Sequence, residues 1–367
     1  MYEFNILTEH RVRYILTSLG IALCALLMLF LVSIYKGVSY GSVEYVREID
    51  ADLWVLQEHA TNILRSTSLM PATYRNDIEG IQGVKSVSPV FFILASVRIG
   101  EKDATLYLTG YDPETGKSGP PSLIKGRNIL SNNEIVIDKA FAAKNRIGIG
   151  DKISVRKDTL TVTGISTGTN MFVIQYAFIT LNEAHRIIGF SNVVSCYQVK
   201  VLPGVNTEII KKNLYRELKN IVVFNKASFI ENNIREMESG IIPLLFIVTL
   251  ISAIVLTAIL SLILSISILE KRKDFAIMKA LGSPAGFVPG IIIRMSLIFS
   301  LTGLILALVL FFPMTSIVER ISPEVSAKTS VLQILAVSTG VIIISLISSV
   351  MPNRRIRKIY PLEVFIQ

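Results

Sequence analysis

The chain has 367 residues, of which 51% are hydrophobic and only 18% are charged, and this balance excludes an ordinary soluble domain. Lys and Arg number 37 against 28 Asp and Glu, which gives a formal net charge of +9. A basic soluble protein would suggest a nucleic-acid partner, but the interleaved aromatic and basic residues of RNA-binding proteins are absent. We therefore expect no nucleic-acid partner, and membrane topology explains the charge.

Four apolar runs are long enough to cross a bilayer, which takes about 20 residues of helix. They are predicted to be transmembrane helices over residues 14–36, 241–269, 287–312 and 332–351. Residues 1–13 place Phe4, Leu7 and Arg11 on one helical face, and this pattern predicts an amphipathic helix on the inner membrane surface. A frayed terminus is the alternative.

The first run is predicted to be a membrane anchor and not a cleaved signal peptide. Its apolar stretch is longer than a signal-peptide core, and no small-residue cleavage site follows it. Ile21-Ala22-Leu23-Cys24 has some likeness to a lipoprotein cleavage box, but Leu23 is bulky where a small residue is needed. Cys24 and Cys196 allow at most one disulfide, so the fold is not expected to depend on a disulfide framework.

Residues 37–240, between the first two runs, have the composition of a folded α+β domain. The expected elements are a strand at 51–57, a helix at 71–81, strands at 84–99, 104–110 and 193–202, a helix at 206–218 and a strand at 221–224. Residues 111–190 are predicted to form an inserted β-rich lobe with strands at 134–138, 152–156 and 159–164 and a helix at 139–145. Residues 228–240 are expected to form a helical stalk that continues into the second span.

The distribution of Lys and Arg orients the spans. An even number of spans places both termini on one side, and the side richer in Lys and Arg is cytoplasmic. The basic residues next to the spans are Arg11, Arg13, Lys271, Arg272, Lys273, Lys279, Arg354, Arg355, Arg357 and Lys358. The loop 313–331 holds two basic and two acidic residues. Both termini, the segment 270–286 and the tail 352–367 are therefore predicted to be cytoplasmic, and the domain 37–240 to lie outside.

The segment between the second and third spans carries the signals of a short helix. Phe275, Met278 and Leu281 recur at i, i+3 and i+6 and predict an apolar stripe. The residues on the opposite side are Lys271, Asp274 and Lys279. Gly282 suits the left-handed position after a helix, and Ser283-Pro284 prevents continuation. This pattern predicts an amphipathic docking helix for a cytoplasmic partner, with the stripe as its contact surface.

No catalytic, cofactor or metal site is predicted. Gly110–Ser118 resembles a phosphate-binding loop, but it has five residues instead of four before the Gly-Lys pair and is interpreted as a junction between lobes. The three histidines, at positions 10, 59 and 185, are too scattered for a zinc site. The spacing typical of a nucleophile elbow or a catalytic triad is absent.

Arg294 is the only charged residue well inside the third run. It could contact substrate or a gate, because charges within the membrane are usually functional. The favoured interpretation is that it lies about two turns from the cytoplasmic end, so its stem reaches the interface. Gly303, with Thr302 and Ala307, offers a small-residue face for helix packing.

Several stretches resemble FtsX-like permeases, the group of ABC transporter subunits that includes MacB, LolC/LolE and DevC. Glu270–Ser283, EKRKDFAIMKALGS, resembles the family stretch E-R-x-R-E-I-G-I-L-R-A-L-G-A. Pro352, Arg354 and Arg355, with Pro361, Leu362 and Glu363, are similar to the closing pattern P-x-x-R-A-x-x-x-x-P-x-E-A-L. The runs Asn133–Asp138 and Ile147–Ile153, followed by Val162-x-Gly164-Ile165, look like the family's n-E-v-v-i-s…l-G-l-k-v-G-D-x-i and V-x-G-I.

The resemblance implies four transmembrane helices and a two-lobed α+β extracytoplasmic domain of the MacB periplasmic core type, in a bacterial-type inner or plasma membrane. It also implies a coupling helix that docks a cytoplasmic ABC ATPase. The residues that match are Glu270, Lys271, Arg272, Asp274, Phe275, Met278, Lys279, Leu281 and Gly282. MacB carries its ATPase on the same chain and this chain does not. ATP and Mg²⁺ are therefore expected in a partner subunit, and no cofactor in this chain.

The resemblance further implies a mechanism in which ATP-driven motion of the spans moves the outer domains. The expected substrate is a lipid, lipoprotein, heme or peptide. The expected partners are a second copy or a close paralogue, membrane lipid and, in some assemblies, a periplasmic adaptor and an outer-membrane protein. One alternative is an FtsX-like regulator that activates a cell-wall hydrolase, and another is a membrane-anchored enzyme or sensor. Two departures are Arg294, where relatives often have an acidic residue, and an outer domain larger than that of FtsX itself.

Overall fold

The computed structural model describes residues 11–115, 117–171, 174–284, 286–325 and 329–357. Contacts divide the chain into two compact units, which we call the bundle unit and the sheet unit. The bundle unit is Met1–Lys36, Ile242–Ile317 and Ala327–Gln367, and the sheet unit is Gly37–Ile241 and Val318–Ser326. Most of the helix predicted for residues 1–13 falls outside the described residues, as does the end of the tail 352–367.

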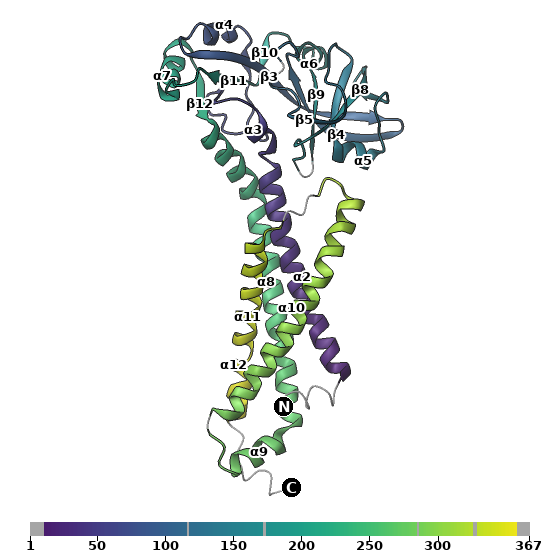
Figure 1. The fold of residues 1–367 in the computed structure, drawn as a ribbon, viewed down its shortest axis with the longest axis vertical. Helices are drawn as coiled ribbons and strands as arrows, with labels where there is room; N and C mark the ends of the chain where they lie inside the picture. Colours follow the sequence, from purple (N-terminus) through teal and green to yellow (C-terminus); the bar gives the residue numbers. More distant parts are fainter. Residues whose placement is uncertain (1–10, 116, 172–173, 285, 326–328, 358–367) are drawn as a thin grey trace. The chain divides into compact units, whose positions relative to one another are not determined.

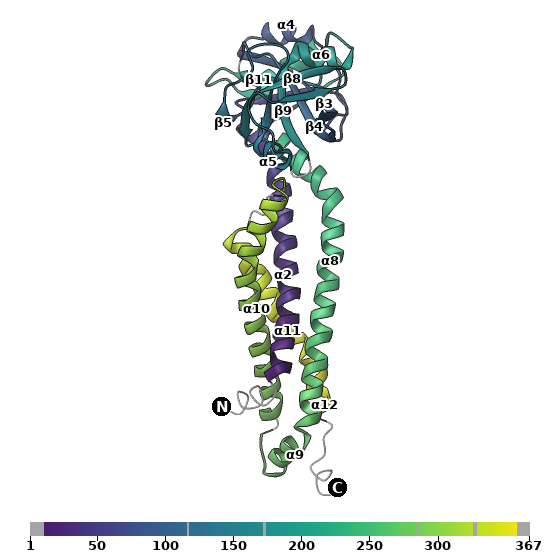
Figure 2. The ribbon, with the colours of Figure 1, turned by 90° about the vertical axis from the view of Figure 1, so that its right-hand side faces the viewer.

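The described residues contain four helices that are long and apolar enough to cross a membrane. They are α2 (Arg11–Gly41), α8 (Lys226–Glu270), α10 (Phe287–Ile321) and α11 (Val331–Ser348), and a short helix, α12 (Val350–Arg357), follows the last of them. Within the bundle unit their long segments run alongside one another (Figure 1 and Figure 2). One buried apolar cluster takes side chains from all four helices, so the four predicted spans form one bundle.

Two of the helices extend further than the predicted spans. α2 ends at Gly41 instead of residue 36, and α10 ends at Ile321 instead of residue 312, which shortens the predicted loop 313–331. Pro313 lies inside α10 without ending it. A proline removes one backbone hydrogen bond, and a long membrane helix accommodates that loss through its neighbours. The fourth candidate span, Val331–Arg355, covers the whole of the predicted residues 332–351, although α11 ends at Ser348 and residues 350 and 351 belong to α12.

A glycine allows α2 and α10 to approach closely. A Cβ atom at Gly303 would lie 2.6 Å from Cγ2 of Ile21 and 3.1 Å from the backbone oxygen of Ser18. At the same contact, the hydroxyl groups of Ser18 and Thr302 are 3.1 Å apart. The small-residue face predicted for the third span is therefore the face that packs on the first span.

A hydroxyl cluster joins α10 to α11. The hydroxyl oxygens of Ser296 and Ser345 are 2.8 Å apart, and Ser300 donates to Ser345 at 3.0 Å. All three side chains are buried. Since hydrocarbon offers no hydrogen-bond partners, polar groups between membrane helices are satisfied by one another and hold the helices together.

In the sheet unit, ten of the described strands form one sheet in the order β12-β1-β11-β3-β4-β9-β6-β8-β5, with β7 paired to β3 and β8. The strands are β1 (Leu53–Gln57), β3 (Val84–Ile99), β4 (Lys102–Tyr111), β5 (Ser122–Gly126), β6 (Glu134–Asp138), β7 (Lys152–Val155), β8 (Asp158–Thr167), β9 (Gln175–Thr180), β11 (Cys196–Val201) and β12 (Ile221–Asn225). The short strands β2 (Met70–Pro71) and β10 (Val193–Val194) pair separately. The helices are α3 (Glu44–Glu48), α4 (Tyr74–Glu79), α5 (Lys139–Asn145), α6 (Leu181–Ile188) and α7 (Thr207–Glu217).

Six of these strands close into a barrel, β3-β4-β9-β6-β8-β7, because β7 pairs with both β8 and the far end of β3. One buried cluster takes apolar side chains from all six strands. The second lobe is therefore not confined to residues 111–190, as predicted, since β3 and β4 belong to it too. The 16 residues of β3 are enough to pair with β11 along one half and with β7 along the other.

The other lobe buries one sheet face beneath α4 and α7. Ile78 of α4 and Ile210 and Leu214 of α7 share a buried cluster with β1, β11 and β12, so the helix predicted at 206–218 is confirmed with its buried positions. The helix predicted at 71–81 is shorter, because Pro71 lies in β2. The strand predicted at 193–202 is divided at Ser195, whose hydroxyl accepts the N–H of Phe92 at 3.0 Å.

We expect Gly303→Ala to lower the melting temperature of the purified chain in detergent, because the added methyl group has no room against Ile21. Overpacking of this kind costs about 1–3 kcal/mol. Gly340→Ala is the matched control, since it also lies inside a membrane helix and a Cβ there meets nothing within 4 Å. Equal melting temperatures for the two variants would contradict the assigned contact between α2 and α10.

Candidate functional site

The short helix predicted between the second and third spans is α9 (Arg272–Ala280). It does not begin at residue 270, as predicted, because Glu270 is the last residue of α8 and Lys271 lies outside helical geometry. The Nζ of Lys271 lies 3.9 Å from Oδ2 of Asp274. One residue with non-helical backbone is enough to change the direction of the chain, so α9 is a separate element between two spans.

A Schellman motif ends α9. Gly282 has φ of +85°, the N–H of Gly282 donates to the carbonyl of Lys279 at 3.1 Å, and the N–H of Ser283 donates to the carbonyl of Met278 at 3.1 Å. These are the two bonds that define the motif, and its left-handed position strongly favours glycine. The predicted left-handed backbone of Gly282 after the helix is confirmed.

The predicted apolar stripe of α9 does not face outward as a whole. Phe275 is only 2% exposed and, with Ala276, belongs to the buried cluster of the bundle, and half-buried Met278 packs against that cluster. Contrary to the prediction, the Phe275 ring is therefore not part of the exposed surface of α9 in this chain. A short helix next to a bundle has to bury its largest apolar side chain on its own chain, and Phe275 holds α9 in place.

The exposed face of α9 has a different composition from the predicted one. Its members are Arg272, Lys273, Ile277, Ala280 and Leu281. Ile277 is 46% exposed and Leu281 is 83% exposed, and their i, i+4 spacing places them side by side. Ile277 was missed because the spacing of Phe275, Met278 and Leu281 was given priority. The face offers two large apolar side chains beside two cations.

Arg294 lies on the exposed side of α10. Its Nη2 would be 3.7 Å from a Cβ at Gly290, so the side chain extends back by one turn toward the start of the helix. This direction agrees with the interpretation that the guanidinium reaches the interface at the α9 end.

The first turns of α8, at the end of the helix opposite α9, lie in the sheet unit and are part of a hydrophobic core. Phe229 is fully buried and stacks on Trp54 with ring centroids 4.7 Å apart. Asn233, also buried, accepts the N–H of Ile63 at 2.9 Å. Arg65 and Glu236 form an ion pair of 2.9 Å. The predicted stalk 228–240 is thus helical and fastened to the segment 61–66.

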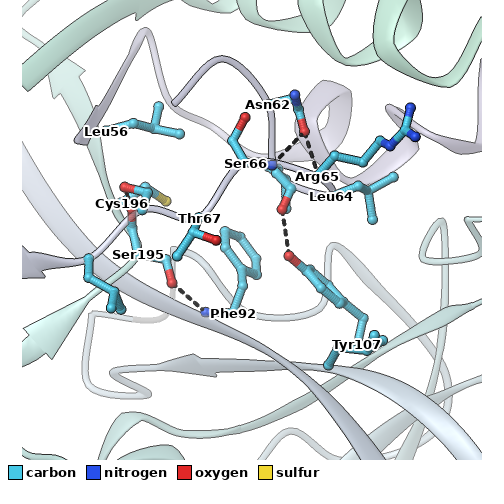
Figure 3. Close-up of a pocket in the computed structure, with 14 residues that line it drawn as sticks. Leu56, Asn62, Leu64, Arg65, Ser66, Thr67, Phe92, Tyr107, Ser195 and Cys196 are labelled. Atoms are coloured by element: carbon cyan, nitrogen blue, oxygen red, sulfur yellow. Dashed lines mark hydrogen bonds between the residues drawn. The ribbon is translucent and has the colours of Figure 1, made fainter. Parts of the chain in front are cut away.

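That segment covers a cavity of about 210 Å³ within the sheet unit (Figure 3). Phe92, Tyr107 and Cys196 belong to its lining. The Tyr107 hydroxyl donates to the carbonyl of Ile63 at 2.6 Å, and Asn62 Oδ1 accepts the N–H groups of the two residues that follow Leu64 (Figure 3). The segment is therefore bonded to the sheet on one side and to α8 on the other.

The stretch Gly110–Ser118 does not have the geometry of a phosphate-binding loop. It begins with the last two residues of β4, and the next element is the strand β5 and not the helix that a phosphate loop requires. Lys117 donates to Ser86 at 2.9 Å, and Ser118 donates to Gln198 at 2.7 Å. This stretch is a structural connection. Within the described part of the chain, no three side chains of His, Cys, Asp or Glu come together as metal ligands would.

Comparison with known families agrees with this architecture. The model of the MacB-like periplasmic core domain matches residues 14–216, and the model of the FtsX-like permease C-terminal region matches residues 246–361. The chain belongs to the FtsX-like, MacB-type family of ABC transporter permeases. The matches assign the sheet unit to the extracytoplasmic side of a multi-pass membrane protein. The chain is a permease subunit, neither matched region is an ATPase domain, and such a subunit works with an ABC ATPase partner.

Relatives match this permease along nearly its whole length. An uncharacterised ABC transporter permease of Methanocaldococcus jannaschii is 23% identical, covering 99% of this chain and 96% of its own. A Staphylococcus epidermidis protein named for hemin transport, the permease protein HrtB, is also 23% identical, with 96% and 95% covered. Among solved structures, the periplasmic region of MacB from Actinobacillus actinomycetemcomitans has a TM-score of 0.40 and 16% identity, covering 51% of this chain and 94% of that one.

We expect Phe275→Ala to destabilise the permease much more than Leu281→Ala, because the first side chain is buried and the second is exposed. Removing the buried ring should cost about 3–5 kcal/mol, whereas removing the exposed side chain should change stability by no more than about 0.5 kcal/mol. Detergent-phase thermal unfolding of the purified permease measures both. A larger loss for Leu281→Ala would show that the orientation of α9 is wrong.

Proposed function

We propose that this permease transmits force from a separate cytoplasmic ATPase, docked on α9, to the sheet unit outside the membrane. The observation that carries the proposal is the continuity of α8. This helix has 45 residues and a length of about 68 Å at 1.5 Å per residue. Its first turns are buried in the sheet unit, and a single residue, Lys271, separates its last residue from α9. A displacement at one end would therefore be carried to the other.

The docking surface that we propose is the exposed face of α9. Ile277 and Leu281 would enter an apolar depression of the ATPase, while Arg272 and Lys273 would orient the complex by charge. Burial of Phe275 in the bundle means that a force on α9 reaches the bundle directly, because a buried aromatic side chain cannot move independently of its neighbours. ATP and Mg²⁺ would be bound by the ATPase and not by this chain.

Topology and assembly follow from the same proposal. Both termini and α9 would be cytoplasmic, and two copies, or one copy and a close paralogue, would each present an α9 to one subunit of an ATPase dimer. In the most apolar window of α8, only 22% of the residues are buried within this chain. That leaves a broad apolar surface for the second copy and for membrane lipid. A periplasmic adaptor and an outer-membrane protein are further candidate partners.

The substrate that we propose is an amphipathic molecule, such as a lipid, lipoprotein, heme or hydrophobic peptide, released on the outer side. The relative named for hemin transport supports this class, and so does the scarcity of charged side chains in the spans. Activation of an outer cell-wall hydrolase is the competing function. It would use the same motion, and capture of a hydrolase without ATP-dependent release of any amphipathic molecule would favour it.

Introducing negative charge on the exposed face of α9 tests whether the ATPase docks there. We expect Ile277→Asp combined with Leu281→Asp to abolish co-purification of the ATPase, because burying two carboxylates in an apolar contact is strongly unfavourable. Leu130→Asp is the matched control, since Leu130 is a highly exposed leucine of the sheet unit. Retention of the ATPase by the double variant, at the level of the control, would disprove the assignment.

Transmission is tested by breaking α8. Insertion of Gly-Ser-Gly after Gly240 should leave ATPase binding and hydrolysis intact but abolish the ATP-dependent distance change between spin labels on the two sheet units. Labels can be placed at Phe190→Cys, an exposed position, in a Cys24→Ser background. The same insertion after Gly204, in a turn with open space around it, is the control. An undiminished distance change in the first variant would refute transmission through α8.

A further inference from the structure

A short segment after the third span reaches the barrel of the sheet unit. α10 continues to Ile321, and the next residues form a turn in which the N–H of Val325 donates to the carbonyl of Ser322 at 2.9 Å. The Glu324 carboxylate lies 2.6 Å from Nζ of Lys144, and the Asn170 amide donates to the Glu324 carbonyl at 3.0 Å. We call these two contacts the clasp. Residues 318–326 group with the sheet unit because of such contacts.

One buried network joins the start of α5, the helix that carries Lys144, to Thr169, which adjoins Asn170. Lys144 lies in α5, which is capped by Asp138 through a bond of 2.7 Å from the N–H of Ala140. The second carboxylate oxygen of Asp138 accepts the Thr169 hydroxyl at 2.6 Å. Thr169 directly precedes Asn170. The ammonium and the amide that meet Glu324 are therefore fixed relative to each other by the fold and are not independent surface side chains.

The clasp makes both favourable and unfavourable contributions to the free energy of the contact. The side chain of Glu324 is only 13% exposed, so its charge is largely removed from water. One oxygen is paired with Lys144, but Oε2 is buried and has no hydrogen-bond partner among the described residues. A buried carboxylate oxygen without a partner opposes docking, because water would satisfy it after release. The pairing with Lys144 and the burial of Oε2 thus act in opposite directions on the free energy of the contact, which suits a contact that is made and released.

We propose that Glu324 is a positioning residue that couples the third span to the barrel, and that the clasp is engaged in one nucleotide state of the transporter and released in another. The third span would then be a second connection to the sheet unit, attached to the barrel, whereas α8 is attached to the other lobe. The release step depends on the proposed ATP-driven motion. The contact itself does not.

Cross-linking in the full permease–ATPase complex tests the clasp. In a Cys24→Ser background, Lys144→Cys with Glu324→Cys should react with a short bismaleimide in the absence of nucleotide. The yield should fall several-fold when the ATPase is trapped with ATP. Absence of the product in every state would refute the contact, and equal yields in all states would refute release. Absence of the cross-linked product would leave the function proposed for α9 and α8 unaffected.

Charge variants supply a second readout. Lys144→Glu should lower the ATP-dependent change in the distance between spin labels on the two sheet units. The exchange Lys144→Glu with Glu324→Lys should restore this change, because the ion pair is re-formed with reversed charges. Lys139→Glu is the matched control, since it is an exposed lysine of the same helix outside the clasp. Failure of the exchange to restore the motion, or an equal loss in the control, would overturn the positioning role.

Discussion

Backbone hydrogen bonds cannot be left unpaired in hydrocarbon, and this constraint determines how the two units of the permease are connected. Inside the hydrocarbon the chain runs as helix, and α2, α8 and α10 each continue as helix past the boundary between the units. α8 has its two ends in different hydrophobic cores, with Phe229 in one and Ile268 in the other. This requirement of the bilayer thus accounts for the continuous helix through which we propose that force is transmitted.

The helix α9 shows how one short element combines packing with recognition. Nine residues are too few for a stable helix in water, so α9 depends on Phe275 for anchoring and on Gly282 for its end. Because both devices belong to the chain itself, Ile277 and Leu281 would already be positioned before the proposed ATPase partner binds. Less conformational freedom would then be lost on association, which would strengthen binding without additional contacts.

Local patterns predicted the elements of this permease well, but not every long-range contact. Alternation of apolar residues located β3 and β6, and the cap Asp138 accompanies a helix predicted with its correct bounds. Closure of the barrel was missed because pairing of β7 with β3 joins residues far apart in sequence. Periodicity identified the apolar side of α9 but could not show that Phe275 packs on its own bundle. The contacts of Asn233 with Ile63 and of Glu324 with Lys144 could not be predicted from the sequence around either residue, because their partners are far away along the chain.

The helical geometry of α8 also has a consequence within the sheet unit. Each residue of an α-helix turns the chain by about 100°, so Phe229 and Asn233, four residues apart, point to the same side of the helix. Loss or gain of a single residue between them would turn Asn233 by more than a quarter turn and break its hydrogen bond to the N–H of Ile63. The number of residues in this first part of α8 is therefore as constrained as their chemistry.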